Sequence, residues 1–219
     1  EEVEKILYII YESADITPYV VAIQYKSVEF AQQNFALGYK TCIRRENIIA
    51  CKEIASYLLL YGDYKEIDGY WLSLDGEYLL FDTQWEQRVD MHIPESVKYI
   101  IPYTLRSVSV KYIKCNKNLK ILYGWSCVFF HSLEKIELND GLKEIGAQCF
   151  YYHNLEYIVI PESVEIIQAE AFQNVTIYCN VEKIPYGWDK DFALNNCKVY
   201  WKGTWEYVDG VPKPILNEG

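Results

Sequence analysis

The sequence predicts an α+β N-terminal module followed by a short solenoid of stacked repeats with a parallel β-sheet. Two observations lead to this fold class: a unit of similar residues recurs in the second half of the chain, and the first ninety residues show helix and hairpin signals without that repeat. We expect three parts: a module or cap over 1–90, a solenoid of about 4–5 repeats over 91–201, and a C-terminal cap and tail over 202–219.

Four segments of the second half align with one another, at 91–100, 113–122, 136–145 and 158–167. An apolar residue at the strand end recurs at positions 93, 115, 138 and 160, in steps of 22, 23 and 22. An apolar pair follows in each segment: Val97/Ile100, Leu119/Leu122, Leu142/Ile145 and Val164/Ile167. The pattern Ile-Pro-Glu-Ser-Val occurs twice, at 93–97 and 160–164. So many positions in register indicate a repeat protein.

One unit is too small to bury its own apolar face, so units must stack and share a continuous core. The alternation over 135–138 has a period of two, which is typical of a strand with one face inward and the other outward. Stacking places these strands side by side in a parallel sheet. Pro94 and Pro161 are expected to end their strands and to shape the turns, because proline donates no ladder hydrogen bond. A small residue and a Phe then return to the core on the far side, in 146–150 and 168–172.

The stretch from Leu155 to Phe172, with Ile-Val-Ile-Pro-Glu-Ser-Val at its centre, resembles the BspA-like (Treponema-type) leucine-rich repeat. The resemblance covers 91–207, and the aromatic segments 184–188, 199–201 and 205–207 are similar to the closing cap of such arrays. It implies a leucine-rich-repeat solenoid with a binding and recognition role, often at bacterial cell surfaces, and without a cofactor. Segments 102–109 and 123–128 lack the usual Ala-Phe, and we expect irregular rungs there.

The first ninety residues predict a small α+β module. One helix is expected from Ser27 to Leu37 and a second from Asn47 to a point before Gly62. Runs 70–74 and 77–81 flank Asp75-Gly76, which predicts a β-hairpin. The apolar runs 5–11 and 19–25 favour strands. The module is either an N-terminal cap on the first rung or a separate binding module.

The charge of the chain disfavours nucleic acid as a ligand. The formal net charge is −10, and residues 1–90 carry 16 acidic and 8 basic residues against 15 and 13 in the remainder. An acidic surface repels phosphate backbones, although it can serve solubility or mimic nucleic acid towards a basic protein. No apolar run reaches the length of a transmembrane helix, so the sequence predicts no membrane insertion.

Seven cysteines lie at 42, 51, 115, 127, 149, 179 and 197, so they cannot all pair within the chain. Several occupy positions where the repeat has an aliphatic residue, which predicts buried free thiols. Such use of cysteine favours a reducing compartment such as the cytoplasm, whereas the family resemblance implies a bacterial cell surface or secretion. The localisation stays open.

Two Cys-x3-His units, at 127–131 and 149–153, contain four plausible zinc ligands. They lie 22 residues apart, one repeat step, so stacking alone predicts a cysteine ladder inside and a histidine ladder at the turn. We therefore expect no metal site and no cofactor. The chain has only 3 histidines and no phosphate loop or paired-carboxylate motif, so it is not expected to be an enzyme.

The outward face of the parallel sheet is the candidate binding surface, because it mixes tyrosines with charges as interface cores do. The residues expected to bind a partner are Tyr112, Lys114, Lys135, Glu137, Tyr157, Val159, Tyr178 and Tyr200. The predicted function is a non-catalytic module that binds a protein partner. Three alternatives stay open: cross-strand pairing that only stabilises the sheet, an effector or enzyme in 1–90 with the solenoid as targeting arm, and a carbohydrate-binding surface protein.

Overall fold

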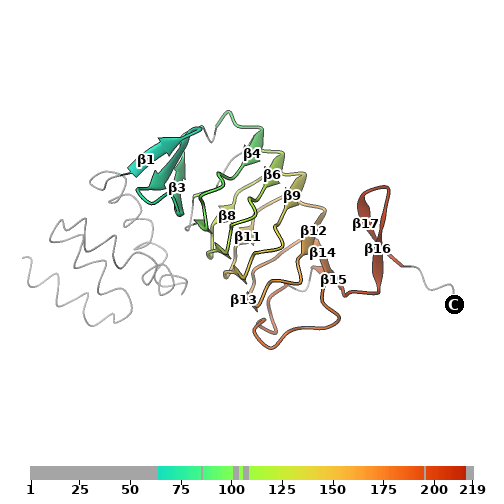
Figure 1. Ribbon diagram of the computed structural model, residues 1–219. Helices are drawn as coiled ribbons and strands as arrows, with labels where there is room; N and C mark the ends of the chain where they lie inside the picture. Colours follow the sequence, from blue (N-terminus) through green and yellow to red (C-terminus); the bar gives the residue numbers. More distant parts are fainter. Residues whose placement is uncertain (1–63, 85, 101–103, 106–108, 195, 216–219) are drawn as a thin grey trace, which may run out of the picture.

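The computed structural model describes residues 64–84, 86–100, 104–105, 109–194 and 196–215. The predicted helices after Ser27 and Asn47, and the apolar runs 5–11 and 19–25, lie outside these residues. Within the described residues every regular element is a β-strand and none is a helix. The strands wind into a β-solenoid of about five turns with parallel sheets, which confirms the predicted solenoid (Figure 1).

The first side of the solenoid carries the sheet predicted from the sequence. It comprises β4 (Asp90–His92), β6 (Tyr112–Lys114), β9 (Lys135–Glu137), β12 (Tyr157–Ile160), β14 (Thr176–Cys179) and β15 (Lys198–Tyr200). All pairings are parallel, within two three-stranded sheets, β4-β6-β9 and β12-β14-β15. The two sheets follow one another along the same side, with β9 next to β12 (Figure 1).

The second side is a seven-stranded sheet. Its parallel part is β5 (Tyr99–Ile100), β7 (Ile121–Leu122), β10 (Glu144–Ile145) and β13 (Ile166–Ile167). Three antiparallel strands continue it at the start of the array: β1 (Tyr64–Ile67), β2 (Tyr70–Ser73) and β3 (Tyr78–Asp82), of which β3 pairs in parallel with β5. The third side is shorter, with β8 (Cys127–Val128) beside β11 (Phe150–Tyr151).

The core is built from equivalent residues of successive turns. In β4, β6 and β9 the central residue is buried between two outward neighbours, as a period of two requires. The predicted apolar pairs are all buried: Val97, Ile100, Leu119, Leu122, Leu142, Ile145, Val164 and Ile167. On the third side the rings of Phe150 and Phe172 stack with centroids 5.4 Å apart. One continuous hydrophobic cluster therefore runs through the array.

Each turn between the first and second sides has the same hydrogen bond. The backbone N–H of the fourth residue donates to the carbonyl of the first, from Val97 to Pro94 at 3.0 Å and from Val164 to Pro161 at 3.2 Å. The prolines therefore begin the turns, as the sequence predicts. Asn116 has the equivalent place one turn on from Pro94, and its buried Nδ2 donates to the carbonyl oxygens of Pro94 (2.6 Å) and Val97 (2.9 Å). This side chain fastens two successive turns together.

The prediction of an irregular rung at 123–128 is wrong. Strand β8 pairs in register with β11, and Trp125 (φ 59°) has the same left-handed conformation as Gln148 (φ 52°). The bend of the third side needs that conformation in each turn, and tertiary stacking imposes it even on a tryptophan. The Ala-Phe sequence is therefore not required for a regular turn. In the other segment, 102–109, Leu105 forms a parallel bridge to Cys127.

The hairpin predicted around Asp75-Gly76 is confirmed by strands β2 and β3. Strand β1 precedes it through a second tight turn at Asp68-Gly69, where both residues have positive φ (52° and 78°). The buried Asp82 holds these strands together, because Arg88 donates to both of its carboxylate oxygens (2.9 and 3.0 Å) and to the carbonyl of Asp68 (3.0 Å). The guanidinium also lies over the ring of Tyr70, 4.1 Å from its centroid.

We expect the substitution Gly146→Ala to lower the free energy of unfolding by about 3 kcal/mol. An added Cβ would lie 2.1 Å from the backbone nitrogen of Gly124 in the preceding turn, so the stacked backbones would have to separate. Gly203→Ala is the control: its Cβ meets nothing within 4 Å, and only its positive φ of 88° costs about 1 kcal/mol. Urea unfolding followed by circular dichroism measures both, and equal losses would contradict the close approach.

We expect Asp82→Ala to cost about 3–5 kcal/mol, because it leaves the Arg88 guanidinium, which is largely buried, without its carboxylate. The exposed pair between Lys111 and Glu134 (2.8 Å) is the matched control, and Glu134→Ala should cost less than about 1 kcal/mol. The same unfolding assay applies. A loss for Asp82→Ala no larger than that for Glu134→Ala would show that the buried pair does not hold the first hairpins in place.

Candidate functional site

The predicted site residues all lie on outward positions of the first side. Tyr112, Lys114, Lys135 and Glu137 come from β6 and β9, and Tyr157, Val159, Tyr178 and Tyr200 come from β12, β14 and β15. Register places Tyr112 beside Lys135 and Lys114 beside Glu137, and it places Tyr178 between Val159 and Tyr200. The structure thus arranges the eight residues along one face, in two groups that correspond to the two sheets.

The group on β6 and β9 is open and internally connected. The Lys135 ammonium lies 5.6 Å from the centroid of the Tyr112 ring and donates to Oε1 of Glu137 at 2.6 Å. The Lys135 hydrogen bond, followed by one from Tyr112, lowers the pKa of Glu137, whereas burial followed by the Glu137 hydrogen bond raises the pKa of Tyr112 to about 12. His92 on β4 packs edge-on against Tyr112, with centroids 6.0 Å apart. These four side chains therefore form one group of mutual contacts.

The group on β12, β14 and β15 is partly covered. The C-terminal hairpin of β16 (Trp205–Val208) and β17 (Val211–Pro214) follows the last strand of the first side. The indole of Trp205 lies 5.2 Å from the Tyr178 ring, and its Nε1–H donates to the carbonyl of Cys179 at 3.1 Å. Tyr178 is consequently only 5 % exposed, although its strand position points outward. Burial also raises the pKa of Tyr178.

Two hollows adjoin this face. A groove of about 780 Å³ runs along the ends of β4, β6 and β9, between His92 and the turns that follow the strands, and reaches Asp68 in the β1–β2 turn. A second hollow of about 340 Å³ lies between the sheet and the C-terminal hairpin, with Tyr157 and Tyr207 in its walls. The two share Glu137, Leu138 and Asp140. A recessed path therefore leads across the face from the first hairpin to the last.

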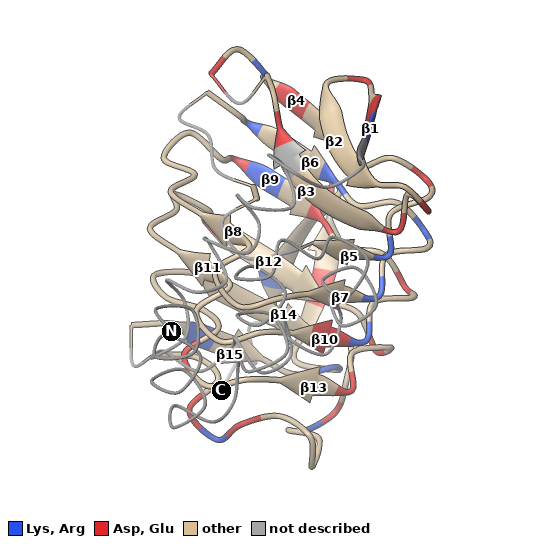
Figure 2. Ribbon diagram, turned by 90° about the vertical axis from the view of Figure 1, so that its left-hand side faces the viewer, with Lys and Arg blue, Asp and Glu red and all other residues tan. Residues whose placement is uncertain are grey.

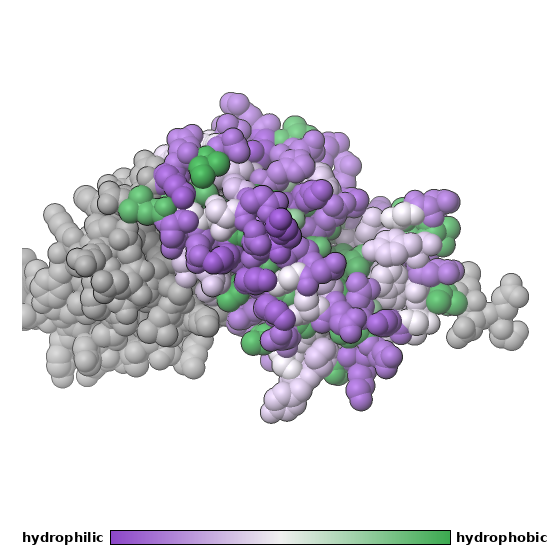
Figure 3. All heavy atoms as spheres, viewed as in Figure 1, coloured by the Kyte–Doolittle hydropathy of each residue, from purple (hydrophilic) through white to green (hydrophobic). Residues whose placement is uncertain are grey.

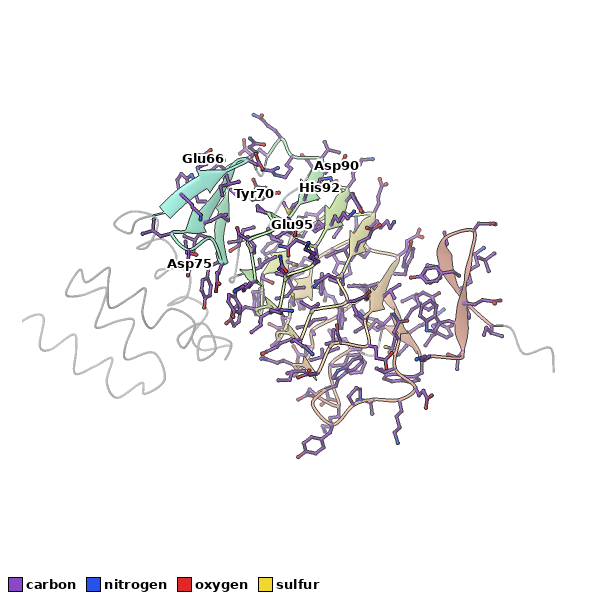
Figure 4. The ribbon with its side chains drawn as sticks, in the orientation of Figure 1. Glu66, Tyr70, Asp75, Asp90, His92 and Glu95 are labelled. Atoms are coloured by element: carbon purple, nitrogen blue, oxygen red, sulfur yellow. The ribbon has the colours of Figure 1, made fainter. Side chains whose placement is uncertain are left out.

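Charge is concentrated on this side and on the turns. Strands β4, β6 and β9 carry both signs, whereas β8 and β11 on the third side carry none (Figure 2). Asp90 and His92 project from β4, and Glu95 lies in the following turn (Figure 4). The surface in view is largely hydrophilic, with apolar residues in small separate groups (Figure 3). On the first side itself, the outward residues of β4, β6, β9, β12 and β15 are tyrosines and charged or polar residues together with Val159, so this face is a mixed polar and aromatic surface.

The predicted histidine ladder is wrong, because the register step between these rungs is 23 residues and Cys127 pairs with Phe150 in the backbone. The predicted contact between cysteines inside the solenoid is present: the buried thiols of Cys127 and Cys149 form a side-chain hydrogen bond, and the Cys127 N–H donates to the Cys149 carbonyl at 3.2 Å. His131 is exposed, whereas His153 is buried. Within the described residues no group of three or more His, Cys, Asp or Glu side chains is placed to hold a metal ion.

The thiols behave as the repeat pattern suggests. Cys115, Cys127, Cys149 and Cys179 are buried and free, and Cys197 is half-buried and free. Burial raises the pKa of both Cys115 and Cys179 to about 12. These sulfurs pack as small apolar groups in the core.

Sequence reasoning missed the covering hairpin. Asp209-Gly210 lies between two runs of strand-forming residues, and both residues adopt positive φ (52° and 78°), as a two-residue turn requires. The same signal at Asp68-Gly69 marks the β1–β2 turn. The Asp-Gly signal that predicted the hairpin at 75–76 would also have predicted the turns at 68–69 and 209–210.

Stacked parallel strands joined by repeated turns define a leucine-rich-repeat solenoid. Residues 84–186, just under half of the chain, match the BspA type leucine rich repeat region in 6 copies. The match confirms the family inferred from the Ile-Pro-Glu-Ser-Val repeats.

Two solved structures resemble the chain. One is the pneumococcal vaccine antigen PcpA, with 16 % identity, a TM-score of 0.49, and coverage of 64 % of this chain and 37 % of that one. The other is a leucine rich cell surface protein from Faecalibacterium prausnitzii A2-165, with 22 % identity, a TM-score of 0.46, and coverage of 64 % and 40 %. The chain thus spans well under half the length of either protein. No curated protein matches it significantly. In the described part, no helix has the length and apolarity needed to span a membrane.

The buried His153 predicts loss of stability in acid. Burial lowers its pKa to about 4 from the ordinary 6.5, and its Nδ1 accepts the Leu155 N–H at 3.1 Å. Below pH 6.5 the unfolded chain binds a proton that the folded chain refuses, so stability falls as the pH drops from 6.5 towards 4. At pH 5 the loss is about 2 kcal/mol. Unfolding free energies measured at pH 7 and pH 5 should show that His153→Gln removes this loss and that His131→Gln, on the surface, keeps it. Equal pH dependence in both variants would contradict the assignment.

Proposed function

We propose that this protein is a non-catalytic interaction protein that binds a protein partner through the outward face of the first side. The observation that carries the proposal is the connected group of His92, Tyr112, Lys135 and Glu137 on the open half of that face. Its aromatic rings and charges contact one another in the free chain, which restricts their rotamers and so reduces the side-chain entropy lost when a partner binds. Tyrosine is also among the residues that contribute most to binding at protein interfaces.

The shape of the face supports a macromolecular partner. The 780 Å³ groove crosses three successive strands and their turns, so a segment of polypeptide fits along it better than a compact small molecule. Its lining offers carboxylates, lysines and amides, which suit polar groups of a protein surface. Amide groups of Asn116 and Asn139 in this lining are fixed by hydrogen bonds to the preceding turn, so the groove is preformed.

The absence of catalysis is part of the proposal. Four of the five described thiols are buried and Cys197 is half-buried. The raised pKa values of Cys115 and Cys179 leave these two thiols protonated near neutral pH. The buried His153 has its Nδ1 occupied by a backbone N–H. Neither arrangement provides an activated nucleophile beside a base. A role in recognition requires neither.

Capture from source-cell extract tests the proposal. The immobilised full chain should retain a protein partner, and Tyr112→Ala combined with Lys114→Glu should weaken binding at least about tenfold, because an interface aromatic is lost and a charge is reversed. Ile166→Ala on β13 is the control: this side chain is exposed on the second side and should leave the affinity unchanged. Titration with the purified partner measures the affinity of the wild type, the double variant and the Ile166→Ala control. Equal affinity of wild type and the double variant would exclude the open half of the face as the binding surface.

A further inference from the structure

The C-terminal hairpin hides a ladder of tyrosines on the proposed binding face. The ring of Tyr178 stacks on Tyr200, with centroids 5.4 Å apart, and lies edge-on to Tyr157 at 6.3 Å. All three point outward from β12, β14 and β15. An outward position on a sheet is buried only where something lies over it, and here the cover is Trp205 of β16.

The hairpin is attached by few contacts. Its side chains Tyr207, Val208 and Val211 are exposed, Tyr207 at 58 %. Trp205 is half-buried, and only Pro212 of the two strands is buried. The exposed ion pair between Lys202, just before the hairpin, and Glu162 at 3.5 Å contributes about 0–1 kcal/mol. An isolated two-stranded hairpin is marginally stable in water. An element with so little buried area is expected to open locally without unfolding of the array.

We propose that β16–β17 is a strap that occupies, within the chain, a docking surface for an aromatic side chain of the protein partner. Trp205 shows what this surface accepts: a flat ring against Tyr178, with an N–H that donates to the Cys179 carbonyl. The partner is therefore a polypeptide segment that presents a tryptophan. The 340 Å³ hollow under the strap adjoins the open groove, so such a segment continues across the face without a break. This inference rests on the proposed function and specifies its partner.

Strap and partner compete for one surface. The measured affinity of the partner is its affinity for the uncovered face multiplied by the fraction of molecules in which the strap is open. A substitution that weakens the strap should therefore raise the affinity, whereas ordinary truncation of an interface residue lowers it.

The first experiment tests the strap without a partner. Tyrosine nitration with tetranitromethane, followed by peptide mass spectrometry, reports the exposure of each ring. We expect Trp205→Ala to increase nitration of Tyr178 at least about tenfold and Trp205→Phe to increase it less, since the ring remains and only the N–H is lost. Tyr186→Ala, which removes a fully exposed ring elsewhere, should change nothing. The core residue Tyr123 should stay protected in every variant and so report an intact solenoid. Protection of Tyr178 unchanged in Trp205→Ala would overturn the proposal.

Hydrogen exchange gives a second measure in the wild-type chain. Amides of β16 and β17 should exchange at least about tenfold faster than those of β12 and β14, because the strap opens while the array stays folded. Exchange of the hairpin as slow as that of β14 would show that it is an integral part of the fold and would overturn the proposal.

The second experiment tests the docking surface with a defined probe. A synthetic peptide of residues 204–215 should bind the Trp205→Ala chain at least about tenfold more tightly than the same peptide with alanine in place of the tryptophan. Equal binding would overturn the proposed aromatic site. The partner captured above should bind Trp205→Ala more tightly than wild type by at least about threefold. Unchanged or weaker binding, in a chain whose Tyr112 variant still loses the partner, would refute the strap and leave the proposed function intact.

Discussion

Backbone hydrogen bonds between successive turns determine the architecture of this protein, because they join equivalent residues of neighbouring units in parallel register. Ile113 of β6 pairs with Met91 of β4 on one side and with Ile136 of β9 on the other. Any residue type therefore lies directly over the residue one step away, whether it is apolar, aromatic or charged. The core, the asparagine side chains between turns and the outward tyrosines are all consequences of this stacking.

The sequence was sufficient to predict the parts that depend on periodicity. The buried pairs, the turns at Pro94 and Pro161 and the alternation on the first side follow from residue type and spacing alone. The register of the third side was predicted wrongly because the two Cys-x3-His units are 22 residues apart, although the pairs Leu119/Leu122 and Leu142/Ile145 just before them already have a spacing of 23. Cys127 consequently pairs with Phe150, and the histidines differ in burial. The left-handed Trp125 also escaped prediction, because tertiary stacking overrides its local preference.

The candidate surface was predicted as one face and is found as two halves. Each of the eight residues points outward, as the period of two requires, yet the hairpin after β15 covers Tyr178 and leaves Tyr112 open. The spacing of residues within a strand predicts which side chains point outward, but it does not predict whether a distant segment, such as the C-terminal hairpin, packs over them. The only local sign was the Asp-Gly pair at 209–210, which identifies a hairpin but not the side on which it lies.

The repeat units differ in length, and the differences lie in the bends between strands rather than in the strands of the outward face. Residues paired on the first side are 22 apart between β4 and β6, 23 apart between β6 and β9, and 19 apart between β12 and β14, while the strands remain in register. Loss or gain of residues is thus absorbed in the bends. Unequal recombination within the gene can add or delete a whole unit and thereby lengthen or shorten the recognition footprint by one strand. The area available for contact with a partner can therefore change during evolution, while the core of each remaining unit stays as it is.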